Sequence, residues 1–207
     1  MNPSALMTII LIKVGPLGAN CYLLGDNKTG RCGIIDPGGE VEKICSALRE
    51  TGFIPCCILL THGHFDHTSA VRPLLEKYPG LPVYINPEDT DGAEHFYHFI
   101  PVSGQRYYKD GDKVKVGELT IRILETPGHS RGSICLLVED ALFCGDTLFD
   151  GSCGRTDLPG GDQAAMDRTM ARLARLPEKL GIFPGHMGES TLGDQFRTNP
   201  FLRQMLP

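Results

Sequence analysis

The segment Thr61–His67 constrains the fold of this chain more than any other, because it holds three histidines and one aspartate within seven residues. It directly follows the continuous apolar run Cys56–Leu60, which has the length and composition of a strand buried on both faces. Polar side chains that follow such a strand lie at one edge of a sheet, where α/β proteins collect functional groups. The segment therefore predicts an α/β fold with a functional site at the strand ends.

Strands and helices alternate along the rest of the chain. Short apolar runs separated by Gly, Pro and Asn predict strands at Met7–Val14, Asn20–Gly25, Cys32–Asp36, Leu81–Ile85, Asp112–Val116, Leu119–Leu124, Ser133–Val138 and Ala141–Cys144. Apolar spacing of three and four residues predicts helices at Val41–Glu50, Asp66–Lys77 and Asp162–Leu176. Pro73 lies inside the second of these, where proline can break or kink a helix.

The alternation occurs in two similar halves without a low-complexity linker. We therefore expect a single α/β domain over residues 1–207, with helices covering the faces of the sheet. The pattern leaves open whether the strands form one doubly wound sheet or two packed sheets.

Composition argues against several classes of function. The net charge is −5 and no run is rich in lysine or arginine, which disfavours a nucleic-acid-binding protein. No apolar run reaches the roughly 20 residues of a membrane helix, and Leu6–Val14 lacks the flanking residues of a signal peptide. The eight cysteines form no CxxC pair and lie mostly in apolar runs, as reduced buried thiols do. We expect a cytoplasmic protein without nucleic-acid or membrane partners, and its oligomeric state stays open.

The spacing within Thr61–His67 suits two adjacent metal ions. Residues i and i+2 of an extended segment point to one side, so His62 and His64 can hold one cation together. If the chain then turns into a helix, Asp66 and His67 face a second point nearby. Imidazole and carboxylate ligands predict zinc, with iron and manganese as alternatives. A loop of structural histidines is the competing interpretation, and four ligand-type groups in six residues argue against it.

Three further segments each end in one ligand-type residue and each follow an apolar run. They are Thr126–His129, Cys144–Asp146 and Phe183–His186. A lone histidine after a strand is more often structural, but with Thr61–His67 these residues complete two ligand sets. Cys144 and Cys153 flank Asp146, and their roles stay open.

His95 and His98 stand apart from these segments. They occur at helical spacing beside aromatic residues. This setting favours a packed or substrate-lining segment over a further metal site.

At this point the ligand pattern resembles a known signature, that of the metallo-β-lactamase superfamily. The likeness covers nearly the whole chain and implies a four-layered αββα sandwich made of two similar halves. It also implies two divalent metal ions, of which zinc is the expected one. One ion would be held by His62, His64 and His129, the other by Asp66, His67 and His186, and Asp146 would bridge the two.

Within the superfamily the chain is most similar to the short, single-domain glyoxalase II-like hydrolases. The likeness is carried by Gly145–Phe149, Gly154–Asp162, Pro184–His186, Ser190–Gly193 and Asn199–Leu202. Full-length glyoxalase II has a C-terminal helical domain that supplies much of its glutathione-binding surface, whereas this chain stops at Pro207. The resemblance therefore implies a thioester hydrolase, with glutathione-derived thioesters as one candidate class of substrate.

The implied mechanism is attack on the thioester carbonyl by a hydroxide held between two metal ions roughly 3.5–4 Å apart. Asp66 and Asp146 are the expected catalytic carboxylates, and Asp146 would set the spacing of the ions. Metal-bound histidines usually have outer hydrogen-bond partners. Asp36 and Asp157 are the candidates, although either can be an ordinary turn residue.

Two other functions compete with this one. A persulfide dioxygenase of the same superfamily would use a single iron, which would map to His62, His129 and Asp146. The segments Pro184–His186 and Ser190–Gly193 look more like those of the hydrolases. A metal-stabilised binding module without activity is the other alternative. The complete ligand set argues against it, because a structural site closes with four ligands.

Overall fold

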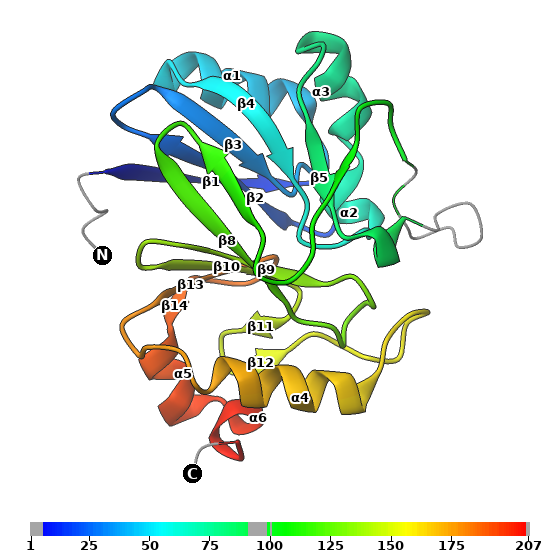
Figure 1. The fold of residues 1–207 in the computed structure, drawn as a ribbon, viewed down its shortest axis with the longest axis vertical. Coiled ribbons are helices and arrows are strands. Elements are labelled where there is room, and N and C mark those ends of the chain that lie inside the picture. The colour runs from blue at the N-terminus through cyan, green and yellow to red at the C-terminus, as the bar shows by residue number, and fades with distance from the viewer. Residues whose placement is uncertain (1–5, 91–98, 100, 206–207) are drawn as a thin grey trace.

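Two six-stranded sheets form the centre of the structure, a computed structural model that describes residues 6–90, 99 and 101–205 (Figure 1). The first sheet has the strand order β1-β2-β3-β4-β5-β6. Its strands are β1 (Met7–Val14), β2 (Ala19–Asp26), β3 (Arg31–Ile35), β4 (Ile54–Leu59), β5 (Val83–Ile85) and β6 (Arg106–Tyr107). Neighbours from β1 to β3 are antiparallel, whereas neighbours from β3 to β6 are parallel.

The second sheet has the order β14-β13-β10-β9-β8-β7. Its strands are β7 (Lys113–Val116), β8 (Leu119–Glu125), β9 (Ile134–Val138), β10 (Ala141–Gly145), β13 (Gly181–Pro184) and β14 (Ser190–Thr191). β7 to β10 form an antiparallel meander, and β13 joins β10 in parallel. A small hairpin of β11 (Leu148–Phe149) and β12 (Ser152–Cys153) follows β10. The strands therefore form two packed sheets and not one doubly wound sheet.

Helices cover the outer face of each sheet, so the layers confirm the predicted αββα sandwich (Figure 1). The helices on the first sheet are α1 (Val41–Thr51) and α3 (Val71–Lys77). Those on the second are α4 (Gln163–Leu173), α5 (Leu192–Thr198) and α6 (Pro200–Arg203). Between the sheets, the rings of Tyr22 and Phe143 meet edge to face with centroids 5.2 Å apart, and Phe183 stacks on Phe143 at 5.1 Å.

The helix predicted over Asp66–Lys77 is in fact two helices, α2 (Phe65–Thr68) and α3. The break precedes Pro73, which lies in the first turn of α3. Proline is tolerated there, because the first-turn N–H groups of a helix have no intrahelical partner. The N–H of Ala70 donates instead to the carbonyl of Pro37 at 2.9 Å, which ties the junction between the helices to the turn after β3.

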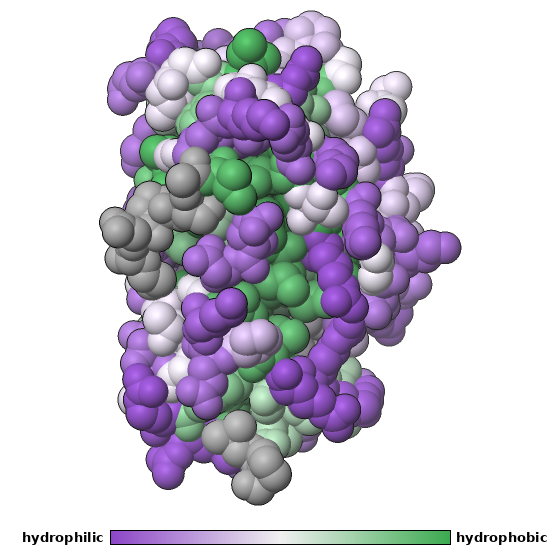
Figure 2. All heavy atoms as spheres, turned by 60° about the vertical axis from the view of Figure 1, so that its left-hand side comes forward, coloured by the Kyte–Doolittle hydropathy of each residue, from purple (hydrophilic) through white to green (hydrophobic). Residues whose placement is uncertain are grey.

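Apolar side chains also reach the surface. Figure 2 shows one face, on which green apolar groups run down the middle between purple polar ones. Folded proteins expose much apolar surface, roughly 55–60% of the total. None of the helices within the described ranges is both long and apolar enough to span a membrane.

Candidate metal centre

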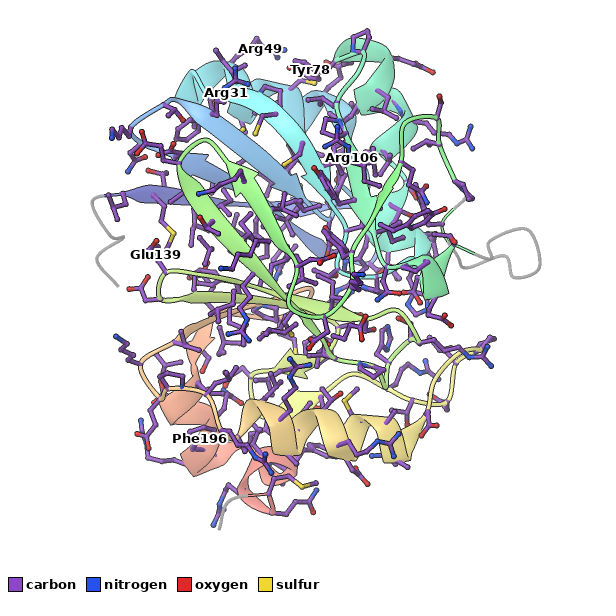
Figure 3. The ribbon with its side chains drawn as sticks, in the orientation of Figure 1. Arg31, Arg49, Tyr78, Arg106, Glu139 and Phe196 are labelled. Atoms are coloured by element: carbon purple, nitrogen blue, oxygen red, sulfur yellow. The ribbon has the colours of Figure 1, made fainter. Side chains whose placement is uncertain are left out.

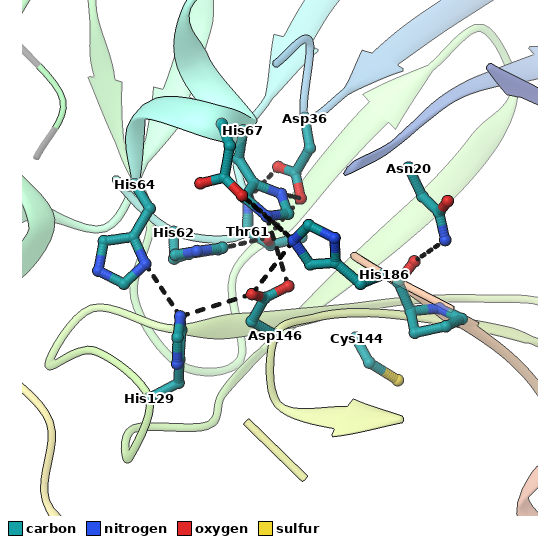
Figure 4. A network of polar contacts seen from close by, with 12 residues as sticks. Asn20, Asp36, Thr61, His62, His64, His67, His129, Cys144, Asp146 and His186 are labelled. Atoms are coloured by element: carbon teal, nitrogen blue, oxygen red, sulfur yellow. Dashed lines mark hydrogen bonds and ion pairs between the residues drawn. The ribbon is translucent and has the colours of Figure 1, made fainter. Parts of the chain in front are cut away.

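Seven ligand-type side chains from both halves of the chain meet where strands of the two sheets end (Figure 4). The segment after β4 contributes four of them, and the loops after β8, β10 and β13 contribute one each. In chain order they are His62, His64, Asp66, His67, His129, Asp146 and His186. Five are buried, while Asp146 and His186 are partly exposed. These are the seven residues predicted from the sequence, and the structure brings all of them together.

The first group consists of His62, His64 and His129, whose ligand atoms all lie within 4.8 Å of one another. Nε2 of His129 lies 2.9 Å from Nδ1 of His64. The ring of His62 lies 4.7 Å from that of His64 and 5.0 Å from that of His129, measured between centroids. Three imidazoles therefore converge on one point, as the resemblance implied.

The second group consists of Asp66, His67 and His186, and it has the same compactness. Nε2 of His186 lies 3.3 Å from Nε2 of His67 and 3.2 Å from Oδ2 of Asp66. The short helix α2 sets this geometry, because it places Asp66 and His67 in its first turn.

Asp146 lies between the two groups. Its Oδ2 is 3.6 Å from Nε2 of His129 in the first group and 3.6 Å from Nε2 of His186 in the second. Its Oδ1 is 3.4 Å from Nε2 of His67. One carboxylate thus reaches both groups, which is the placement expected of a bridging ligand.

The ligand atoms of the two groups are placed to bind metal ions, and not all of them can be satisfied by hydrogen bonds to one another. Within the described residues, the buried Nε2 of His62 and Oδ1 of Asp146 have no hydrogen-bond partner. A buried polar atom without a partner costs about 1–3 kcal/mol. A tetrahedral ion with bonds of about 2.0–2.1 Å would hold two nitrogens about 3.3 Å apart, the separation seen between His67 and His186. The residues therefore fit a pair of divalent ions.

The protonation of His62 and Asp66 suits metal binding. Burial, together with the neighbouring His67 and His64, lowers the pKa of His62 well below its usual 6.5, so this imidazole is neutral at pH 7. Burial raises the pKa of Asp66, but the hydrogen bond from His186 and the charge of His67 outweigh it and lower that pKa to about 2. A neutral imidazole and an ionised carboxylate are the forms that bind metal. His67 differs: burial lowers its pKa, but neighbouring carboxylates, that of Asp146 foremost, outweigh this and raise it to about 9. Metal binding at His67 therefore releases a proton.

Asp36 orients His67 from behind. Its Oδ2 lies 3.1 Å from Nδ1 of His67, which must donate to it, and the lone pair of Nε2 is then turned towards the centre. The same carboxylate accepts from the backbone N–H of Thr61 at 2.7 Å and from its hydroxyl at 2.6 Å. Asp36 also groups closely with His62 and His67, but its oxygens are already engaged, so we assign it as an outer partner.

Replacing Asp36 by asparagine is expected to weaken metal binding by about 10- to 100-fold, because the uncharged amide has one acceptor oxygen in place of two and cannot accept from both Thr61 and His67. Asparagine suits the left-handed backbone of this residue, whose φ is 49°. A competition titration against a chromophoric chelator measures the change. Asp26→Asn is the matched control, since Asp26 is also buried but accepts from Thr29. Equal affinities of Asp36→Asn and wild type would contradict the assignment.

The alternative outer partner, Asp157, does not have that role. Its carboxylate is exposed and binds the guanidinium of Arg155 through two contacts of 2.7 Å. The outer partner of His129 is instead the backbone carbonyl of Arg155, which lies 2.8 Å from Nδ1. The sequence could not show that a backbone carbonyl, and not a carboxylate, is the partner of His129, because every residue type has a backbone carbonyl.

Two supporting residues escaped the sequence interpretation. Asp89 accepts from the N–H of Gly63, the hydroxyl of Ser130 and the N–H of Gly132, so it joins two ligand-bearing loops. Asn20 donates through its amide to the carbonyl of Pro184 at 2.8 Å and so holds the loop that carries His186 (Figure 4). Both act on backbone far away in the chain.

A cleft of about 520 Å³ opens beside the metal centre. Its apolar wall is formed by Leu17, Phe65, Phe149 and Leu158. Cys153 lines it as well, and burial raises the pKa of this thiol to about 11, so it stays protonated at pH 7. Cys144 is fully buried, and its thiol donates to the carbonyl of Leu142. His95 and His98 lie outside the described residues.

Comparisons with known proteins agree with this geometry. The sequence model described as "Metallo-beta-lactamase superfamily" matches residues 14–186. Hydroxyacylglutathione hydrolase GloC of Haemophilus influenzae is 31% identical, over 95% of this chain and 98% of its own length. The crystal structure of BLEG-1 B3 metallo-beta-lactamase superposes with a TM-score of 0.86 at 31% identity, covering 94% of this chain and 99% of that one. The di-iron-bound form of TTHA1623 has a TM-score of 0.80 at 38% identity, covering 93% and 100%.

Proposed function

This chain belongs to the metallo-β-lactamase superfamily and has the ligand groups of a metal-dependent hydrolase, and from this premise we propose that it hydrolyses thioesters with two metal ions. The observation that carries the proposal is the position of Asp146 between two complete ligand groups. In a centre with a single metal ion at the first group, Asp66, His67 and His186 would form a second ligand group with no ion to bind. The name of the relative GloC supplies the thioester class, with a glutathione-derived acyl thioester as the proposed substrate.

Each ligand-bearing segment has a defined task in this proposal. When bound, the two divalent ions supply a water of lowered pKa as nucleophile and stabilise negative charge on the attacked oxygen. Asp146 sets the spacing of the two ligand groups, and Asp36 holds His67 in the tautomer that can bind. Asp66, ionised because its pKa is lowered to about 2, contributes the charge of the second group.

The cleft matches a thioester with an apolar portion. Leu17 and Phe65 stand on its wall and are 59% and 36% exposed, so they can exclude water when a substrate covers them. Arg155 also lines the cleft and offers a cation to a carboxylate of the substrate, although Asp157 competes for it. A thiolate leaves readily near neutral pH, so the centre needs no strong general acid.

The test combines metal analysis with three assays on the same protein. We expect two ions per chain after loading with Zn²⁺, Mn²⁺ or Fe²⁺, and release of thiol from S-lactoylglutathione. The Asp66→Ala variant should lose this activity. One ion per chain with oxygen uptake on glutathione persulfide would establish the dioxygenase instead. Opening of a cephalosporin ring without thiol release would assign the chain to the class named for BLEG-1.

A further inference from the structure

A second cavity of about 520 Å³ lies at the end of the sandwich opposite the metal centre. It is lined by residues of β3, β4, β5 and β6 and by the turn between β7 and β8. Cys56 lines it near the start of β4, whereas His62 follows the end of that strand. The two residues are six positions apart, a length of chain that spans at most about 20 Å when fully extended, and none of the residues that line this cavity lines the metal cleft. The cavity is therefore not part of the hydrolytic cleft.

A bulge in β4 brings two thiols to this cavity. Cys32 of β3 pairs with Pro55 and Gly33 pairs with Cys57, so Cys56 is an extra residue without a partner across the strands. Cys56 and Cys57 consequently both line the cavity, although neighbours in a regular strand point to opposite faces. Cys56 is half-buried and Cys57 is buried.

The charge around these thiols is positive. Arg31, Arg106 and Lys115 line the cavity, and neither arginine takes part in an ion pair with another described residue. Arg106 donates to the hydroxyl of Tyr84 at 2.8 Å and lies over its ring, which holds the guanidinium at the cavity. Figure 3 shows Arg31 and Arg106 in the upper half of the view, over the first sheet. The one acidic lining residue, Glu118, is paired with Lys28 at 2.8 Å.

Donors are also directed at the sulfur of Cys56. The thiol of Cys57, the backbone N–H of Gly117 and the charge of Arg31 together lower the pKa of Cys56, against the effects of burial and of Asp26. Gly117 has φ +58°, and a Cβ there would lie 2.1 Å from Oδ2 of Asp26, so the turn that presents this N–H requires glycine. Reactive cysteines occupy such electropositive, partly exposed positions.

We propose that this cavity is a second site, which binds small anionic disulfides and at which Cys56 forms a mixed disulfide with them. The thiolate of Cys56 attacks one sulfur of the bound disulfide. The disulfide bond of the ligand breaks as the new bond between Cys56 and one half of the ligand forms. The other half leaves as a thiolate and takes a proton from solvent. The sulfur of Cys56 is oxidised and the departing sulfur is reduced, so no further reagent is needed.

The chain contains its own control for this proposal in Cys153. Of the eight cysteines, Cys56 and Cys153 are half-buried and the other six are buried. Cys153 lines the metal cleft, where burial and the charge of Asp167 raise the pKa of its thiol to about 11. The two thiols are similarly exposed to solvent, but the pKa of Cys56 is lowered and that of Cys153 is raised. We therefore expect Cys56 to react with the disulfide and Cys153 not to react.

The experiment measures adduct formation by intact-mass spectrometry and locates it by peptide mapping. The probes are glutathione disulfide, which carries net negative charge, the neutral bis(2-hydroxyethyl) disulfide and the cationic cystamine. We expect one adduct per chain at Cys56, formed about tenfold faster with the anionic probe than with the cationic one, and more slowly at high salt. Cys153→Ser should leave the rate unchanged, and Cys56→Ser should abolish the adduct.

The double variant Arg31→Gln with Arg106→Gln tests the role of charge without touching sulfur. Loss of the charge of Arg31 raises the pKa of Cys56 and slows all three probes, but the anionic probe should slow about tenfold more than the neutral one. Equal labelling of Cys56→Ser and wild type, or equal rates for anionic and cationic probes, would overturn the proposal. The readout is a mass adduct far from the metal centre, so the result stands whether or not thioester hydrolysis is found.

Discussion

Asp146→Asn is expected to lower kcat/KM for S-lactoylglutathione by about 10³-fold, or about 4 kcal/mol of transition-state stabilisation. The carboxylate approaches nitrogens of both ligand groups at 3.4–3.6 Å. An amide carries no charge and offers one oxygen in place of two, so it cannot serve both groups equally. The effect should fall on kcat more than on KM, because the cleft binds the substrate, whereas negative charge develops on the attacked carbonyl oxygen only in the transition state.

Asp140→Asn is the matched control for this loss. Asp140 directly precedes β10 and Asp146 directly follows it, so the same chemical change is made at the two ends of one strand. The side chain of Asp140 is exposed, and we expect its variant to keep full activity. Metal content is measured in the same samples. If Asp146→Asn keeps more than a tenth of the activity, the bridging role is wrong.

The ligand set could be predicted from the sequence because its members are dense and follow recognisable strands. Four of the seven lie in six consecutive residues, and the continuous apolar run before them marks a buried strand. The alternation of strands and helices could be predicted for a related reason, since apolar runs and their spacing mark the residues that a strand or helix buries. Only the resemblance, and no periodicity, indicated two sheets rather than one.

The parts that escaped prediction depend on contacts between distant segments. The amide of Asn20 and the carbonyl that accepts from it are 164 positions apart, and nothing local marks either one. The sequence also could not tell which of Asp36 and Asp157 is an outer hydrogen-bond partner of a ligand, since both follow apolar or glycine-rich segments. β6 has two residues, both exposed, so it lacks the hydrophobic signal by which strands are recognised. The break before α3 is made by the turn after β3 and not by Pro73.

Removal of metal by a chelator is expected to lower the Tm by about 10 °C. Ligands that bind only the folded state stabilise it by RT ln(1 + [L]/Kd), about 4 kcal/mol at a thousandfold excess over Kd. For a chain of this size, 1 kcal/mol shifts the Tm by about 2–4 °C. The structural reason is that partnerless donor atoms, such as Nε2 of His62, are buried and gain their partner only from a bound ion.

Leu136→Ala separates this effect from general loss of stability. Leu136 is fully buried between the sheets, and its truncation should cost about 2–5 kcal/mol. Because it lies in the inter-sheet core and is not one of the ligands, the metal-dependent increment in Tm should persist in this variant. Differential scanning calorimetry gives four Tm values, one for each protein with metal and one for each after chelation, and the metal content is measured in every sample. An unchanged Tm in wild-type protein that has demonstrably lost its metal would show that the ligand groups are stable without ions, contrary to the free-energy cost expected of buried polar atoms that lack a partner.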